Sequence, residues 1–317
     1  MNVLSVFDGI SCGRVALERG GHKVDKYYAS EIDKYAIKIS EKNYPDIIRL
    51  GDILQWRTWD IDWAGINLLL AGSPCQGFSF AGKRLNFDDE RSKLFFVFVD
   101  ILKHIQTLNP SVKFMLENVR MKKEHELTIT KILDTLPVYI NSSLVSAQSR
   151  RRTYWTNIPG DDMFGAISQP EDKGIFLKDI LENGLPAWAV KYGKIITKHN
   201  ANKACCIQAS DYKGLKNRQD CSIAIVGYAN IKGREIIRRV YGVNGKLPTL
   251  LAVCGGQQQP KISNDGCYYR RLTPLEYERL HTLPDNYTDC VSNSRRYHAL
   301  GNGWTIDVIV HILRWLK

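Results

Sequence analysis

The chain of 317 residues carries 44 Lys and Arg against 33 Asp and Glu, a formal net charge of +11. This length can bury a large core, as one domain or as one domain that carries a smaller inserted one. No stretch approaches the roughly 20 continuous apolar residues of a membrane span. The N-terminus lacks the features of a signal peptide. We therefore expect a cytoplasmic protein that makes no membrane contact, and the positive charge favours a polyanionic partner such as nucleic acid.

The eight cysteines are scattered over positions 12, 75, 205, 206, 221, 254, 267 and 290. They form no Cys-x-x-Cys pair, and no histidine cluster with metal-ligand spacing accompanies them. We expect reduced thiols and no bound metal.

The first 52 residues predict three strands, each followed by a small or acidic residue. An alternating apolar run over residues 1–7 leads into a glycine turn and a helix, a second strand ends at Glu31, and a third ends at Asp52. A glycine turn lets a ligand approach the backbone, and an acid after the second strand is typical of ribose binding. Because G-x-G-x-x-G is absent, we expect a nucleoside cofactor without phosphates and disfavour a nicotinamide dehydrogenase.

A candidate nucleophile follows the next strand. Residues 66–71 have the length of a buried strand, and Pro74-Cys75-Gln76 follows it. Open α/β sheets place reacting groups at the carboxyl ends of strands, so we interpret Cys75 as a nucleophile, although most free cysteines are simply buried. Residues 76–90 are a candidate lid. A strand over 113–116 ends in Glu117-Asn118-Val119, which places a carboxylate at the same sheet edge.

Gln148, Arg150 and Arg152 share one face of a predicted extended segment. Two guanidiniums on one face favour an anion or carbonyl oxygens in front of them, and a surface charge run is the alternative. Residues 160–268 are rich in Gly, Asn, Lys and Gln, which predicts a smaller, mostly β domain whose basic residues contact phosphates and base edges. Thr273 and Glu276 predict a capping box, and the last amphipathic helix is expected to pack back onto the first domain.

With these motifs in order, the chain resembles the DNA (cytosine-5)-methyltransferases of bacteria and phages over its whole length. The motifs are Phe7-Asp8-Gly9, Pro74-Cys75-Gln76, Glu117-Asn118-Val119, Gln148-x-Arg150-x-Arg152, Pro248-Thr249-Leu250, Arg271-Leu272-Thr273-Pro274 and Gly301-Asn302. The sequence departs from the family where Asp8 and Ser11 replace the commoner Ala and Gly, and where Gly303-Trp304 replaces Ser-Val.

The resemblance implies a Rossmann-like α/β catalytic domain over residues 1–159 and a smaller, mostly β target recognition domain over 160–268. A C-terminal segment, 269–317, completes the catalytic domain. The implied cofactor is S-adenosyl-L-methionine. The residues expected to bind it are Phe7, Asp8, Gly9, Ile10, Ser11, Glu31, Ile32, Asp52, Ile53, Pro74, Leu94, Asn302, Gly303 and Trp304.

The implied reaction is methyl transfer to carbon 5 of a flipped-out cytosine in a short duplex DNA target, as in restriction–modification systems. Cys75 adds to carbon 6, Glu117 hydrogen-bonds or protonates N3, and Arg152 with Arg150 holds O2. Gln76 and Asn118 complete the expected catalytic set. Carbon 6 is inaccessible in a stacked duplex, so the base must leave the stack. We expect a monomer with no obligate protein partner.

Two alternatives remain. A tRNA-methylating branch of the same family carries a Cys-Phe-Thr element, and the closest approach in this chain is Cys267-Tyr268-Tyr269. A catalytically silent nucleic-acid-binding module would have lost the Cys, Glu or Arg of the site, and all are present.

Overall fold

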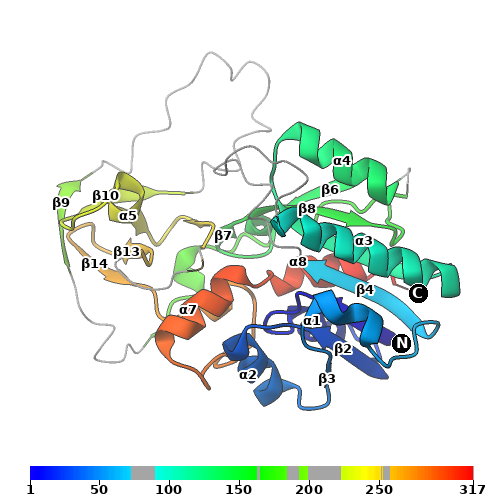
Figure 1. Ribbon diagram of the computed structural model, residues 1–317. Helices are drawn as coiled ribbons and strands as arrows, with labels where there is room; N and C mark the ends of the chain where they lie inside the picture. The colour runs from blue at the N-terminus through cyan, green and yellow to red at the C-terminus, as the bar shows by residue number, and fades with distance from the viewer. Residues whose placement is uncertain are drawn as a thin grey trace. The chain divides into compact units, whose positions relative to one another are not determined.

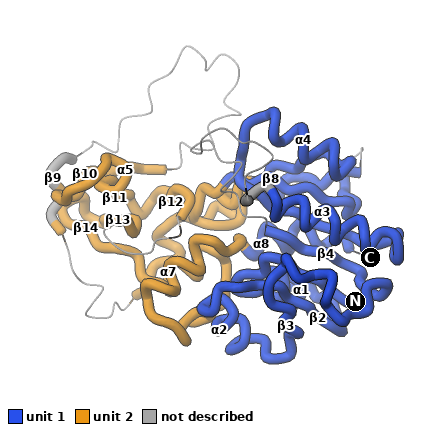
Figure 2. Tube along the Cα trace, in the orientation of Figure 1, with its two compact units in different colours: residues 1–140, 151–170, 306–317 blue, residues 141–150, 171–305 orange. Residues whose placement is uncertain are grey.

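A computed structural model describes residues 1–72, 90–162, 165–183, 193–198, 223–250, 252 and 258–316 (Figure 1). The expectations that concern Pro74, Cys75, Gln76 and the loop up to residue 89 lie outside these residues. The chain forms two compact units (Figure 2). The first unit comprises residues 1–140, 151–170 and 306–317, and the second comprises 141–150 and 171–305. The division into domains at 159 and 268 stays a prediction, because these units are defined by compactness alone.

The first unit is built on a seven-stranded sheet with the order β3-β2-β1-β4-β5-β8-β6. The strands are β1 (Asn2–Val6), β2 (Lys26–Ser30), β3 (Ile48–Arg49), β4 (Ile66–Gly72), β5 (Lys113–Val119), β6 (Pro137–Asn141) and β8 (Arg151–Thr156). The pairs from β3 to β5 are parallel, and β8 runs antiparallel to β5. The apolar runs form the central strands because both faces of a parallel sheet are buried.

Among the described residues of this unit, the helices are α1 (Cys12–Arg19), α2 (Lys34–Asn43), α3 (Glu90–Leu108), α4 (Lys123–Leu133) and α8 (Ile306–Leu313), with a 3-10 turn, η1, at Ile53–Thr58. The core joins α3 to β4 and β5 through fully buried side chains such as Phe98, Leu69 and Phe114. α8 packs against α1, and an ion pair of 2.6 Å joins Arg19 to Asp307. The prediction that the last helix packs back onto the sheet domain is confirmed.

The second unit contains a closed barrel with the order β10-β11-β13-β14-β9. Its strands are β9 (Gly193–Lys198), β10 (Ile225–Ala229), β11 (Arg239–Gly242), β13 (Lys261–Ser263) and β14 (Tyr268–Arg271). A separate two-stranded sheet pairs β7 (Gln148–Ser149) with β12 (Leu247–Pro248). The smaller, mostly β part that the composition predicted is therefore present.

Short helices complete the second unit: α5 (Glu235–Arg238), α6 (Pro274–Leu280) and α7 (Asn293–Asn302), with 3-10 turns η3 (Ser142–Leu144) and η4 (Leu177–Asp179). The predicted capping box is present, since the Thr273 side chain accepts from the Glu276 amide and the Glu276 carboxylate accepts from the Thr273 amide. Within the described ranges, no helix is long and apolar enough to cross a membrane.

Candidate cofactor and catalytic site

The turn after β1 adopts a tight, left-handed conformation beside the end of β2. Phe7, Gly9 and Ser11 have φ of 57°, 60° and 60°. The Gly9 amide donates to Glu31 Oε2 at 2.8 Å, and Glu31 Oε1 accepts from the amides of Ile32 and Asp33. A carboxylate offers about four acceptor positions, so Glu31 can join the two turns and still accept from a ligand hydroxyl. A Cβ added at Gly9 would meet no atom within 4 Å, so space is open in front of this residue.

The Asp8 side chain stabilises the same turn through buried hydrogen bonds. Its Oδ1 accepts from the Tyr27 hydroxyl at 2.9 Å and its Oδ2 from the Ser11 hydroxyl at 2.5 Å. Ser11 also shares a hydrogen bond of 2.6 Å with Ser40 of α2. Burial raises the pKa of the Asp8 carboxyl above its ordinary value, and the hydrogen bonds oppose this rise. The Asp8 side chain therefore belongs to a buried polar network.

A cavity of about 60 Å³ opens between the first three strand ends. Its lining residues are Asp8, Gly9, Ala29, Glu31, Ile37, Ser40, Arg49 and Gly51. This volume exceeds the roughly 10–15 Å³ that one water needs. The structure thus brings together three of the predicted cofactor residues, namely Asp8, Gly9 and Glu31. Ser40 and Arg49 also line this cavity and were not predicted; Arg49 donates to Ser40 Oγ at 3.1 Å. The position of Arg49 at the end of β3 is a signal that could have indicated it.

The remaining predicted cofactor residues of the first unit differ in exposure. Asp52 caps η1, its Oδ1 accepting from the Leu54 amide at 2.9 Å. Ile53 and Ile10 are buried, Ile32 is 74% exposed, and Phe7 and Leu94 pack partly buried against the core. Ile32 is thus an accessible apolar surface next to the Glu31 carboxylate.

Glu117 lies at the carboxyl end of β5, directly beside Gly72 at the end of β4. The segment that carries Cys75 begins immediately after Gly72. Arg152 of β8 reaches Glu117 with Nε at 2.7 Å from Oε1, and both side chains are about nine-tenths buried. This pair places a carboxylate and a guanidinium together at this sheet edge, where the sequence predicted the carboxylate.

Asn118 is buried next to Glu117. Its Oδ1 accepts from the Val119 amide, while its Nδ2 is buried without a hydrogen-bond partner among the described residues. A buried donor without a partner costs free energy of about 1–3 kcal/mol.

Arg150 lies in the second unit and contacts different partners from Arg152. Its guanidinium donates to the carbonyls of Leu250, Gly301 and Gly303, and the residue is 4% exposed. The expected shared face of Arg150 and Arg152 is interrupted, because the extended segment divides into β7 and β8 on either side of Arg150. The Gln148 amide is buried, and neither of its polar atoms has a partner within the described ranges.

The predicted cofactor residues of the second unit follow α7. Asn302 ends this helix and Gly303 caps it, its amide donating to the carbonyls of Ala299 and Leu300. Trp304 is buried, and its carbonyl lies 3.2 Å from His281 Nδ1. In the part of the chain that the structure describes, no group of three or more His, Cys, Asp or Glu side chains could hold a metal.

The strand order, the glycine turn after β1 and the acids at successive strand ends define a doubly wound, Rossmann-like α/β fold. The family model of the C-5 cytosine-specific DNA methylases matches residues 1–317, and the chain belongs to this family. The prediction of the family is therefore confirmed, as is the predicted fold class.

Individual relatives agree with this assignment. The type II methyltransferase M.NgoBV of Neisseria gonorrhoeae is 33% identical over 238 residues, which cover 68% of this chain and 54% of that protein. The chain thus spans about half the length of this relative. The type II methyltransferase M.HhaI of Haemophilus parahaemolyticus is 30% identical over 330 residues, with 98% and 93% of the two chains covered.

Solved structures share the fold. The S. pombe Dnmt2 methyltransferase superposes with a TM-score of 0.66 at 18% identity, covering 100% of this chain and 98% of that one. The Entamoeba histolytica methyltransferase EhMeth gives a TM-score of 0.66 at 16% identity, with 100% and 97% covered.

Proposed function

We propose that this protein transfers a methyl group from S-adenosyl-L-methionine to carbon 5 of a cytosine in a short duplex DNA target. The observation that carries the proposal is the Glu117–Arg152 pair beside the end of β4, in a chain of the C-5 cytosine-specific DNA methylase family. The printed names of the curated relatives, type II methyltransferases, support it.

The residues around the first strand ends fit the proposed cofactor. Gly9 leaves open space, Glu31 retains an acceptor position suited to a ribose hydroxyl, and Asp52 has acceptor positions suited to an adenine amino group. The exposed face of Ile32 offers an apolar contact, and Phe7, Ile10, Ile53, Pro74, Leu94, Asn302, Gly303 and Trp304 complete the proposed set. The cofactor supplies an electrophilic methyl group on a sulfonium.

The protein's residues make the cytosine reactive. Carbon 5 is a poor nucleophile, so the Cys75 thiolate adds to carbon 6 and makes carbon 5 enamine-like. Glu117 hydrogen-bonds or protonates N3 as charge develops in the ring. Arg152 orients the Glu117 carboxylate through their ion pair and donates to O2. After methyl transfer, carbon 5 loses its proton and Cys75 is eliminated, which restores the double bond.

The proposed partner is duplex DNA, bound by a monomer. The target cytosine must leave the base stack, and the segment after Cys75 is the proposed lid. Residues 160–268 are proposed to read the target. Arg234 and Arg239 flank α5, and Arg238 is its last residue. Such basic residues position a protein on phosphates.

Transfer of labelled methyl groups to duplex DNA and, in parallel, to bulk tRNA tests the proposal, with bisulfite sequencing of the DNA. We expect label in DNA at cytosines of one short motif. Label only in tRNA would move the protein to an RNA substrate, and label in neither would indicate a silent binding module.

Cys75→Ser should abolish transfer and leave duplex binding intact. Cys290→Ser is the matched control, since Cys290 is a cysteine of the second unit that forms no disulfide and lies outside the proposed catalytic set. Turnover by the Cys75→Ser variant would sink the assignment of the nucleophile.

A further inference from the structure

A chain of hydrogen bonds links the ends of the first three strands of the sheet. Arg49, the last residue of β3, donates from Nη2 to Ser40 Oγ of α2 at 3.1 Å. Ser40 Oγ lies 2.6 Å from Ser11 Oγ, and the Ser11 hydroxyl donates to Asp8 Oδ2 at 2.5 Å. The Tyr27 hydroxyl of β2 donates to Asp8 Oδ1 at 2.9 Å. We call these five residues the Asp8 chain.

The hydrogen bonds of the Asp8 chain have one direction. An arginine can only donate, so Ser40 Oγ accepts from Arg49 and its own hydrogen can donate to Ser11. Ser11 in turn donates to Asp8, which also accepts from Tyr27. Both carboxylate oxygens of Asp8 are thus acceptors, and such donors favour the charged form of a carboxyl, in opposition to the effect of burial. The Asp8 chain therefore supports a negative charge next to Gly9.

Asp8 shares a cavity with a second carboxylate. Asp8 and Glu31 both line the cavity of about 60 Å³ described above, together with one guanidinium, that of Arg49. Arg49 also faces an acid that does not line the cavity, with Nε 3.6 Å from Glu41 Oε1. Three carboxylates and one guanidinium therefore meet here, in a protein whose net charge is +11. This local excess of negative charge favours a positively charged ligand.

We propose that Asp8 is a specificity-determining residue that makes the site prefer the positively charged cofactor to its neutral product. This inference rests on the proposed function, which assigns S-adenosyl-L-methionine to this site. The cofactor carries a sulfonium, bonded to the ribose that Glu31 is proposed to bind, whereas S-adenosylhomocysteine has an uncharged thioether there. A fixed negative charge stabilises the first ligand and not the second. A site with this preference is less inhibited by its own product.

The test measures the dissociation constants of the full chain for S-adenosyl-L-methionine and for S-adenosylhomocysteine by calorimetry, without DNA, so that no methyl group is transferred. The discrimination ratio is the constant for the product divided by that for the cofactor. Two unit charges up to about 15 Å apart interact strongly enough, at an effective dielectric constant of about 20, to change an affinity about fivefold or more. We therefore expect the discrimination ratio to fall about fivefold or more in Asp8→Asn.

A double variant, Asp8→Ala with Ser11→Gly, removes the same charge and introduces the residues that are commoner in the family. Glycine adopts the positive φ of 60° at position 11 without strain, so this turn should fold. The discrimination ratio should fall as in Asp8→Asn. A wild-type ratio in either folded variant would overturn the inference, and so would loss of folding in both, which would assign Asp8 to stability.

Ser30→Ala is the matched control. The Ser30 hydroxyl donates to the Gly51 carbonyl at 2.7 Å, and Gly51 lines the same cavity, but this variant changes no charge. It should keep the wild-type discrimination ratio even if both ligands bind more weakly. An equal fall in Ser30→Ala would mean that any loosening of the cavity removes the preference, and would overturn the electrostatic role of Asp8. If the wild type binds neither ligand, the proposed function fails as well; binding with an unchanged ratio in the Asp8 variants refutes the inference alone.

Discussion

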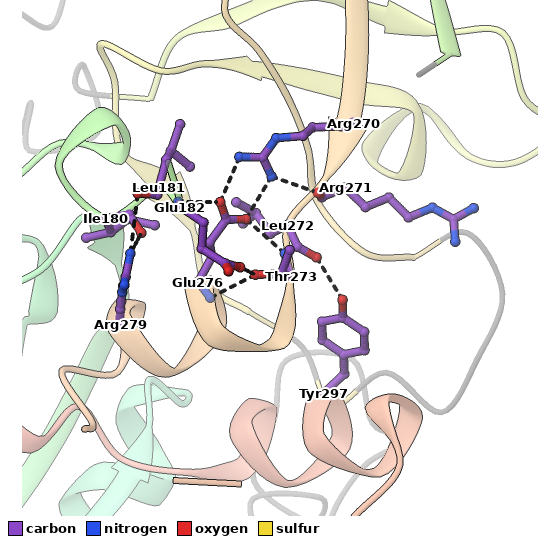
Figure 3. A network of polar contacts seen from close by, with 10 residues as sticks. All are labelled: Ile180, Leu181, Glu182, Arg270, Arg271, Leu272, Thr273, Glu276, Arg279 and Tyr297. Atoms are coloured by element: carbon purple, nitrogen blue, oxygen red, sulfur yellow. Dashed lines mark hydrogen bonds and ion pairs between the residues drawn. The ribbon is translucent and has the colours of Figure 1, made fainter. Parts of the chain in front are cut away.

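Glu276 is the acceptor at the centre of a buried polar network in the second unit (Figure 3). Its carboxylate accepts from Arg270 Nη1 at 2.8 Å and Nη2 at 2.7 Å, from the Thr273 amide at 2.9 Å and from the Glu182 amide at 3.1 Å. Glu182 lies on the chain before β9, and Arg270 lies in β14, the last barrel strand. The Glu276 carboxylate of α6 thus binds both the segment that precedes the barrel, at Glu182, and the last barrel strand, at Arg270.

Glu276→Gln keeps the size of this side chain and removes its charge. Arg270 is 8% exposed at its side chain, so the variant leaves a buried guanidinium without its counterion. Breaking a buried pair in this way costs about 3–5 kcal/mol. For a unit of this size each kcal/mol corresponds to about 2–4 °C, so the melting temperature should fall by roughly 6–20 °C. Urea unfolding gives the free energy, and hydrogen exchange of peptides from β14 and α6 locates the change.

A matched control is the neighbouring pair between Arg279 and Asp285. Its N–O distance is similar, 2.6 Å against 2.7 Å for Arg270 and Glu276, but its side chains are 31% and 45% exposed. Asp285→Asn should therefore cost less than about 1 kcal/mol. A loss in Glu276→Gln no larger than in Asp285→Asn would refute the reasoning. The double variant Arg270→Met with Glu276→Leu should be more stable than Glu276→Gln, since it leaves no unpaired buried charge.

Three further outcomes are expected. Glu117→Gln should slow methyl transfer by about 10²-fold or more while cofactor affinity is retained, because a general acid is lost; unchanged single-turnover rates would contradict its role. Gly9→Ala should weaken cofactor binding at least about tenfold, because its methyl group enters the cavity. Gly21→Ala is the control: Gly21 also has a positive φ, 74°, and open space around an added Cβ. Both variants should cost roughly 1–2 kcal/mol of backbone strain, but Gly21→Ala should leave cofactor affinity unchanged. Burial lowers the pKa of Lys261 from 10.5 to about 8, so the wild type loses up to about 3 kcal/mol of stability as pH falls from about 10.5 to 8. Lys261→Met has no amino group to titrate. As pH falls from about 10.5 to 8, the free energy of unfolding of this variant minus that of the wild type should therefore rise, and below about pH 8 it should stay constant. If urea titrations give the same difference at every pH, the assigned burial is wrong.

Three strands of the sheet, β1, β2 and β4, were predictable because their cause is local. The runs over residues 1–7, 27–30 and 66–71 are apolar enough to be buried, and they appear as β1, β2 and β4. The start of α6 was also predictable, because Thr273, Pro274 and Glu276 cap a helix through contacts within four residues. Such signals are contained in a short window of sequence.

The segment from 138 to 156 was harder to predict. The sequence indicated one extended segment that carries Gln148, Arg150 and Arg152, whereas the structure ends β6 at Asn141 and divides the later segment at Arg150 into β7 and β8. β6 ends at Asn141, whose side-chain Oδ1 accepts hydrogen bonds from the amides of Ser143 and Arg150. β7 and β8 separate because they pair with strands about 100 and about 40 residues away in sequence, β12 and β5. Pairings over such distances leave no local pattern, so the separate partners of Arg150 and Arg152 could not be predicted.

The departures from the family in the first motif have a physical explanation in the structure. Ser11 occupies a left-handed conformation in which a side chain costs about 1–2 kcal/mol relative to glycine. Its hydroxyl bonds both Asp8 and Ser40 in a buried setting, and two such bonds contribute about 1 kcal/mol each. Asp8 in turn needs Ser11 and Tyr27, since a buried carboxyl without donors would be strongly destabilising. The two replacements are therefore energetically coupled, because Asp8 and Ser11 stabilise each other through their hydrogen bond. Neither side chain fills the open space at Gly9, which stays free for the cofactor.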